Sequence, residues 1–154
     1  MTRNSLILIA AAGSLALLAG AFAFQYFGGL IPCVLCLYQR WPHAAAVLIG
    51  VLALRSKGAT LPYLGMLAAL TTAAIGVFHV GVEQTWWEGL ATCTVDTLTG
   101  ISGADLLNTD ITVGAPVRCD AIPWQMIGIS MAGWNAIASF GLAAIWLMAA
   151  RKKA

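Results

Sequence analysis

The chain has 154 residues, of which 60% are hydrophobic and only 9% are charged, and its formal net charge is +2. Soluble domains average about half apolar and about a quarter charged residues, so this composition excludes an ordinary soluble domain. We expect a single all-α integral membrane domain covering residues 1–154, with no nucleic-acid partner.

The first apolar stretch, residues 5–27, is near the ~20 residues that cross the hydrocarbon core of a bilayer as a helix. Arg3 precedes it, and the Ala-Phe-Ala sequence at 21–23 imitates the cleavage site of a signal peptide. The apolar core of a signal peptide is only about 7–15 residues long, however. We therefore predict an uncleaved membrane-spanning helix.

Three further spans follow. The apolar run at 41–54 is too short by itself, but extending it back to Cys36 gives a span at 36–55, preceded by a short outer loop at 28–35. A tight connection then leads to the third span, 61–83, and the fourth is predicted at 124–148. Short connections make neighbouring helices antiparallel, so the fold class is a four-transmembrane-helix bundle.

A second, longer outer loop covers residues 84–123. Ser102 and Asp105 have the spacing of a helix-capping box, and apolar residues follow them. We predict a short interfacial helix here, lying against the membrane surface.

The distribution of charge predicts the orientation of the bundle. The cations that four antiparallel spans would place on one side are Arg3, Arg55, Lys57, Arg151, Lys152 and Lys153. Positive charge is enriched in cytoplasmic segments, so we expect both termini in the cytoplasm. The cysteines, which are Cys33, Cys36, Cys93 and Cys119, then all face the opposite compartment, where disulfides persist.

Cys33 and Cys36 form a Cys-x-x-Cys pattern that structural disulfides, half zinc sites and redox pairs share. A closed zinc site would need a second close ligand pair, whereas Cys93 and Cys119 are far apart and have no histidine at finger-like spacing. We therefore expect no metal. Inert structural disulfides remain an alternative, but two pairs at two depths suggest a relay, with the loop pair reaching water and the Cys-x-x-Cys pair at the bilayer edge.

Arg40 favours the redox interpretation. The start of a helix stabilises a thiolate, and Arg40 follows Cys36 by four residues, which places its guanidinium on the same helix face. A charge near the membrane boundary commonly either extends to water or serves a functional partner, and we favour the functional role for Arg40. We hypothesise that Arg40 donates to a carbonyl oxygen of a quinone and stabilises negative charge as electrons arrive from Cys36.

The two histidines are harder to interpret. His43 and His79 both fall toward the outer ends of neighbouring spans, which would permit a haem with two axial histidines. A lone histidine near a helix end is more often a packing or interfacial residue. We leave His79 out of the predicted catalytic residues.

The cysteine motif and the fourth span together resemble the DsbB family of disulfide bond formation proteins, over essentially the whole chain. The residues that carry the resemblance are Pro32-Cys33-Val34-Leu35-Cys36-Leu37-Tyr38-Gln39-Arg40, Cys93, Cys119, Pro123, Trp124, Gly128, Ser130, Met131, Trp134 and Asn135. The Cys-x-x-Cys-x-Tyr-x-Arg block is far more specific than Cys-x-x-Cys alone.

The resemblance implies a quinone-dependent protein thiol-disulfide oxidoreductase of the bacterial inner membrane, with its cysteines in the periplasm. It implies the disulfides Cys33–Cys36 and Cys93–Cys119, and attack on Cys93 by a reduced DsbA-like thioredoxin-fold protein. Cys119 would then attack Cys33, and Cys36 would be released as the thiolate facing ubiquinone or menaquinone. Arg40 matches the arginine that contacts the quinone in this family.

Two other functions remain open. One is a non-enzymatic membrane scaffold with structural disulfides. The other is a specialised or reducing-direction quinone-linked enzyme resembling the vitamin K epoxide reductase homologues. The Cys-x-x-Cys of those homologues typically follows the loop cysteines, whereas here it precedes them.

Overall fold

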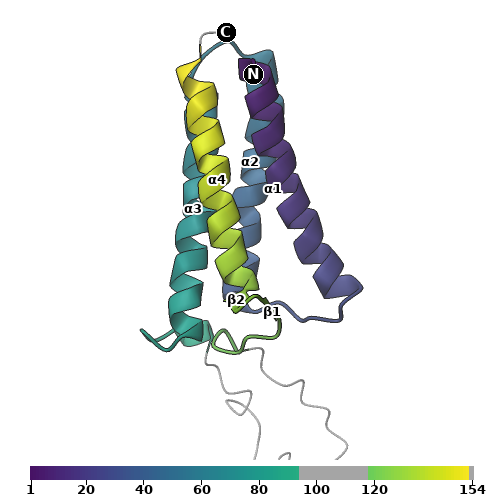
Figure 1. The fold of residues 1–154 in the computed structure, drawn as a ribbon, viewed down its shortest axis with the longest axis vertical. Helices are drawn as coiled ribbons and strands as arrows, with labels where there is room; N and C mark the ends of the chain where they lie inside the picture. Colours follow the sequence, from purple (N-terminus) through teal and green to yellow (C-terminus); the bar gives the residue numbers. More distant parts are fainter. Residues whose placement is uncertain (94–117, 153–154) are drawn as a thin grey trace, which may run out of the picture.

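A computed structural model describes residues 1–93 and 118–152 of the chain. Its long helices are α1 (Arg3–Tyr26), α2 (Val34–Arg55), α3 (Thr60–Glu83) and α4 (Met131–Arg151). A one-turn 3-10 helix, η1 (Ala91–Cys93), follows α3, and a hairpin of β1 (Gln125–Met126) and β2 (Ile129–Ser130) precedes α4. The long helices run antiparallel, with both termini and the α2–α3 connection at one end (Figure 1).

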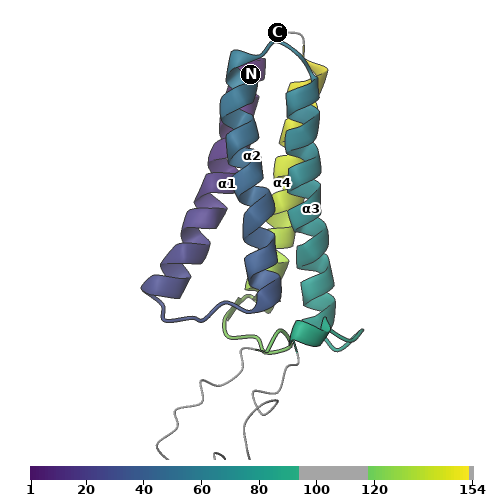
Figure 2. The same cartoon turned by 180° about the vertical axis from the view of Figure 1, so that it is seen from behind.

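A buried hydrophobic cluster brings α1, α2, α3 and α4 together toward the end of the bundle that holds the termini. Trp146 of α4 is completely buried there, among small and branched residues of the other helices. Gly65 of α3 allows this, because a Cβ at this position would lie 2.6 Å from the Trp146 ring. Figure 2 shows α1 leaving the bundle toward its C-terminal end, so the helices separate near the cysteines.

Arg3 joins the start of α1 to the end of α2. Its buried guanidinium donates to the carbonyl oxygens of Ser56 and Gly58, each at 2.8 Å, and to that of Ala53 at 3.4 Å. The last carbonyls of a helix have no partners within the helix, and a cation there also complements the helix dipole. Arg3 is therefore a structural residue that caps α2 from another helix.

The outer surface of the bundle is apolar. Among the described residues, α1, α3 and α4 are long and apolar enough to cross a membrane. Large apolar side chains are exposed along the helices, including those of Leu8, Leu15, Leu48, Leu64, Leu67, Ile137 and Phe140. α2 has a comparable length of 22 residues, but Gln39, Arg40 and His43 make its first half more polar.

The first three predicted spans differ from α1, α2 and α3 by at most two residues at either end, but the predicted start of the fourth is wrong. α4 begins at Met131 and not at Trp124, because Ile127 and Gly128 adopt positive φ angles of 54° and 74° and turn the chain into the hairpin. Ser130 then caps α4 by accepting from the Gly133 N–H. The predicted surface helix after Ser102 lies outside the described residues.

Candidate functional site

The N-terminus of α2 presents two free thiols. Cys33 is the N-cap residue, and its sulfur accepts a hydrogen bond from the backbone N–H of Cys36 at 3.3 Å. The two sulfurs lie 2.9 Å apart without a bond between them. The sequence predicts a Cys33–Cys36 disulfide, whereas the structure shows the dithiol form, with the sulfurs close enough to form the bond after a small movement.

The loop cysteines form the second pair. A disulfide joins Cys93 at the end of η1 to Cys119, with the Cα atoms 5.2 Å apart. Their exposed fractions are only 3% and 0%, because they pack with Cys33, Leu35 and Val82 in one buried cluster. The expectation that this pair reaches water is therefore wrong in this state. The fold instead places the disulfide against the thiols.

Aromatic packing holds η1 near α3. The Trp87 indole donates to the carbonyl oxygen of Phe78 at 3.0 Å, and the two rings stack with their centroids 5.8 Å apart. Trp87 also covers Gly81, where a Cβ would overlap the indole ring. The absence of a side chain at Gly81 thus lets the segment before Cys93 fold back onto α3.

His79 of α3 lies between the two cysteine pairs. Its Nε2 atom is 3.6 Å from the Cys33 sulfur, 3.2 Å from the carbonyl oxygen of Cys119 and 3.9 Å from a carboxylate oxygen of Glu83. The side chain is buried. His79 therefore belongs to the site, although it was left out of the predicted catalytic residues. No local motif marks it, because the two cysteines that it contacts are 40 or more residues away in sequence.

A chain of hydrogen bonds determines which nitrogen of His79 carries the proton. The Gln39 amide nitrogen donates to the carbonyl oxygen of Leu35 and to Nδ1 of His79, at 3.3 and 3.1 Å. Since Nδ1 accepts, Nε2 carries the hydrogen of the neutral ring and directs it toward the sulfur and the Cys119 carbonyl. His79 is thus arranged as a hydrogen-bond donor to a thiolate.

The same tautomer bears on metal binding. Cys33, Cys36 and His79 bring three potential ligand atoms within 4.8 Å of one another, which the spacing of residues in the sequence did not predict. A zinc-bound imidazole needs a free lone pair on the nitrogen that faces the metal. Here Nε2 carries the hydrogen, so the arrangement suits a thiolate better than a zinc ion.

Electrostatics distinguish Cys33 within the cluster. Its pKa lies well below the usual value for a thiol, mainly because the hydrogen bond with Cys36 stabilises the thiolate, while burial opposes this effect and His79 adds to the stabilisation. Beside the other pair, Arg118 makes two hydrogen bonds to Asp120 and lowers the pKa of this partly exposed carboxyl. Arg118 therefore shares its charge with a carboxylate next to Cys119.

A cavity of about 350 Å³ opens beside Cys36, where α1 separates from the bundle. Its polar lining residues are Gln25, Cys36, Gln39, Arg40, His43 and Asn135, and its aromatic ones are Phe24, Trp124 and Trp134. Cys33 does not line it. A flat ring with polar oxygens matches this combination of aromatic walls and hydrogen-bonding groups.

Arg40 lies where the sequence predicts it, on the same helix as Cys36 and in the wall of this cavity. Its guanidinium donates to the side chain of Gln25 at 2.6 Å and to the carbonyl oxygen of Ala21 at 3.4 Å, and lies 4.8 Å from the centroid of the Phe22 ring. Nε of Arg40 is buried and has no hydrogen-bond partner among the described residues. Arg40 could therefore donate a further hydrogen bond to a ligand.

Comparisons with known proteins give one consistent result. A family model described as disulfide bond formation protein DsbB matches residues 3–149. Proteins named disulfide bond formation protein B are similar to the chain: one from Azoarcus sp. (strain BH72) is 32% identical, covering 97% of this chain and 95% of the relative. One from Xanthomonas oryzae pv. oryzae (strain MAFF 311018) is 34% identical, covering 90% and 84%. No solved structure matches the chain.

Proposed function

Because the chain belongs to the DsbB family of disulfide bond formation proteins, we propose that it reoxidises a periplasmic DsbA-like thioredoxin-fold protein and passes the electrons to a membrane quinone. The observation that carries this proposal is the position of the cysteines. Cys33 belongs to the same buried cluster as the Cys93–Cys119 disulfide, whereas Cys36 lines the cavity with Arg40. The Cys93–Cys119 disulfide, the Cys33/Cys36 pair and the cavity thus lie in the order in which the proposed relay would use them.

In the proposed relay, a thiolate of the partner attacks Cys93, and Cys119 leaves as a thiolate. The second thiol of the partner then releases Cys93, which leaves the partner oxidised. Cys119 attacks Cys33 in the Cys33–Cys36 disulfide, and Cys36 leaves as a thiolate facing the cavity. Cys93 then attacks Cys119, which restores the Cys93–Cys119 disulfide and releases Cys33 as a thiol. Formation of the Cys33–Cys36 bond would pass two electrons to the quinone, and the two protons lost by the partner would balance those that the quinone gains.

His79 and Arg40 have different tasks in this scheme. The Nε2–H of His79 stabilises negative charge on Cys33 and holds the carbonyl group of Cys119 beside it. Arg40 supplies positive charge near Cys36 and a donor for an oxygen of the acceptor. When bound, the quinone supplies the two-electron acceptor, and ubiquinone and menaquinone both have the two oxygens that such a site would recognise.

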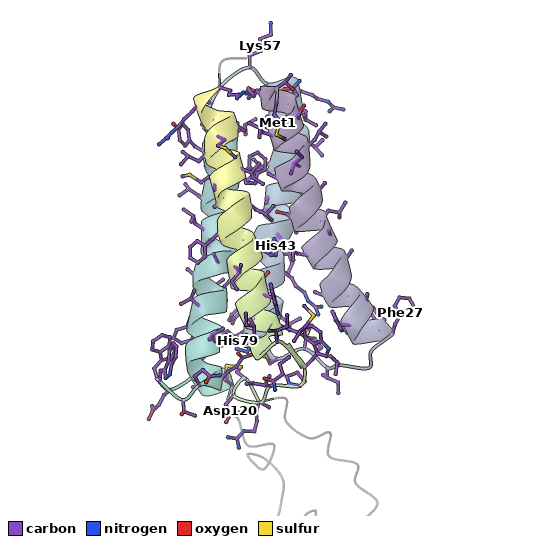
Figure 3. All side chains as sticks on the ribbon, viewed as in Figure 1. Met1, Phe27, His43, Lys57, His79 and Asp120 are labelled. Carbon is purple, nitrogen blue, oxygen red and sulfur yellow. A yellow bond between two sulfur atoms is a disulfide. The ribbon has the colours of Figure 1, made fainter. Side chains whose placement is uncertain are left out.

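The proposed topology makes α2 a fourth membrane crossing and places the protein in the bacterial inner membrane. Figure 3 supports it by showing Met1 and Lys57 at one end of the bundle and Asp120 at the other. With the basic end in the cytoplasm, both cysteine pairs lie on the periplasmic side. A cysteine-labelling reagent that cannot cross the membrane should therefore reach single cysteines introduced near Asp120 but not near Lys57.

The function can be tested with purified protein, a reduced DsbA-like protein and a ubiquinone analogue, by following the absorbance of the quinone. We expect wild-type turnover, and no quinone reduction by Cys36→Ser, which should still form a mixed disulfide through Cys93. Leu48→Ala, on the exposed face of the same helix, is the matched control and should turn over normally. Turnover by Cys36→Ser would refute the relay, and an inactive wild-type protein would support a scaffold.

A further inference from the structure

His43 lines the same cavity one helical turn beyond Arg40, and the proposed relay gives it no role. Its exposed fraction is only 3%. Figure 3 shows it midway along the bundle, whereas His79 lies nearer the end with the cysteines. A buried titratable ring in the wall of an acceptor cavity therefore requires an explanation.

The neighbours of His43 determine its tautomer. The Asn135 amide nitrogen donates to the side-chain oxygen of Gln39 at 2.6 Å and to the hydroxyl of Thr72 at 3.1 Å. The side-chain oxygen of Asn135 must therefore accept from Nε2 of His43, 2.8 Å away, so Nε2 carries the hydrogen. Nδ1 is left as a lone-pair acceptor, buried and without a hydrogen-bond partner among the described residues. Such atoms are rare in folded proteins.

Four side chains then form one directional series of hydrogen bonds. His43 donates to Asn135, Asn135 to Gln39, and Gln39 to Nδ1 of His79. His79 in turn directs its Nε2–H at the carbonyl oxygen of Cys119. Because aligned hydrogen bonds polarise one another, a negative charge near His79 favours a positive charge on His43 at the opposite end.

We propose that His43 takes up a proton at Nδ1 and transfers it to an oxygen of the para-quinone bound in the cavity. The proposal deepens the proposed function and rests on it. As the Cys33–Cys36 bond forms, two electrons reach the quinone and its two oxygens gain two protons. One proton comes from His43 and the other from solvent, while the protons of the two thiols are released to water, which then reprotonates His43.

The positions of Arg40 and His43 fit a para-quinone. Arg40 and His43 are separated by about 4.5 Å along the helix axis, comparable to the width of a ring that carries two opposite oxygens. Arg40 then serves one oxygen and His43 the other. The remaining titratable groups nearby are Cys36 on α2 and His79 on α3, while α1 and α4 present the neutral amides of Gln25 and Asn135 to this region.

Binding can be measured without turnover, because Trp124 and Trp134 line the cavity and a bound quinone should quench their fluorescence. The background is the Cys33→Ser/Cys36→Ser protein, in which these two thiols neither titrate nor react. In this background we expect the Kd for a ubiquinone analogue to rise with pH, by up to about tenfold per pH unit, because binding is coupled to one proton.

His43→Gln is the decisive variant, because its amide N–H can replace Nε2 as donor to Asn135 while the titratable nitrogen is removed. At low pH, the Kd of this variant for the quinone analogue should be about tenfold higher than that of the background protein, and it should not change with pH. Leu48→Ala should keep the pH dependence of the background. A pH-indicator dye provides a second measurement with His43 intact, and it should report net uptake of about one proton when the quinone binds at high pH.

The possible outcomes separate the two proposals. The role of His43 is overturned if the Kd of His43→Gln for the quinone keeps the pH dependence of the background protein. It is also overturned if the quinone binds without proton uptake at any pH. Either result holds even if the wild-type protein turns over. A wild-type protein that neither binds quinone nor oxidises its partner overturns the proposed function itself. If His43→Gln does not fold, the dye measurement still decides the question.

Discussion

Removing the imidazole of His79 should weaken the acidity of Cys33. In His79→Leu, the sulfur loses a buried donor at 3.6 Å, and the carbonyl of Cys119 loses its partner at 3.2 Å. A hydrogen bond to a charged group contributes about 1.5–3 kcal/mol, which corresponds to a roughly 10- to 100-fold smaller ionisation constant for the Cys33 thiol. The pKa of Cys33 should therefore rise toward its ordinary value.

The assay is the rate of alkylation of Cys33 as a function of pH, with the modified residue identified by mass spectrometry. Only the thiolate reacts, so the midpoint of the profile should move to higher pH in His79→Leu. His79→Gln, which can offer an amide N–H in place of Nε2, should lie between this variant and the wild type. If His79→Leu folds and its alkylation profile matches that of the wild type, then the Nε2–H does not stabilise the thiolate.

Three further predictions follow from individual contacts. Arg40→Leu should raise the apparent quinone KM at least tenfold, with Arg40→Lys less affected, in steady-state assays; an unchanged KM would remove Arg40 from the site. Gly65→Ala should cost about 1–3 kcal/mol in thermal unfolding, because its Cβ meets the buried Trp146 ring, whereas Gly141→Ala, with nothing within 4 Å, should cost nothing; equal stabilities would contradict this packing. Gly81→Ala should displace the Trp87 indole and speed the capture of a reduced partner by Cys93 in stopped-flow mixing; unchanged kinetics would show that this packing does not limit access.

The sequence predicts the helices well where the signal is a long apolar run. The first three spans differ from α1, α2 and α3 by at most two residues at either end. The apolar runs determine the first and third, whereas the second required extending the run at 41–54 back to Cys36 to reach the length of a span. The start of α4 was missed because the apolar pattern continues through the hairpin, and the turn depends on positive φ angles at Ile127 and Gly128. Of these two residues, only glycine adopts such angles readily.

In the candidate site, neighbours on one helix could be predicted from the sequence, whereas contacts between distant segments could not. Cys36 and Arg40 could be placed together from the sequence, since residues four apart share a helix face. His79 could not, because its contacts with Cys33 and Cys119 come from packing between segments that are distant in sequence. The burial of Cys93 was missed for the same reason, since loop residues are usually exposed.

The burial of the Cys93–Cys119 disulfide affects the two steps of the proposed relay in opposite ways. Packing against Cys33 shortens the path for exchange between the pairs, and His79 contacts both sides of this path. The same packing shields Cys93 from a partner protein, because in-line attack on a disulfide needs access to the sulfur. The described form, with Cys33 and Cys36 free and Cys93 joined to Cys119, corresponds in the proposed relay to the state after exchange between the pairs. In the same proposal, capture of the next partner would require η1 to move away from the end of α3.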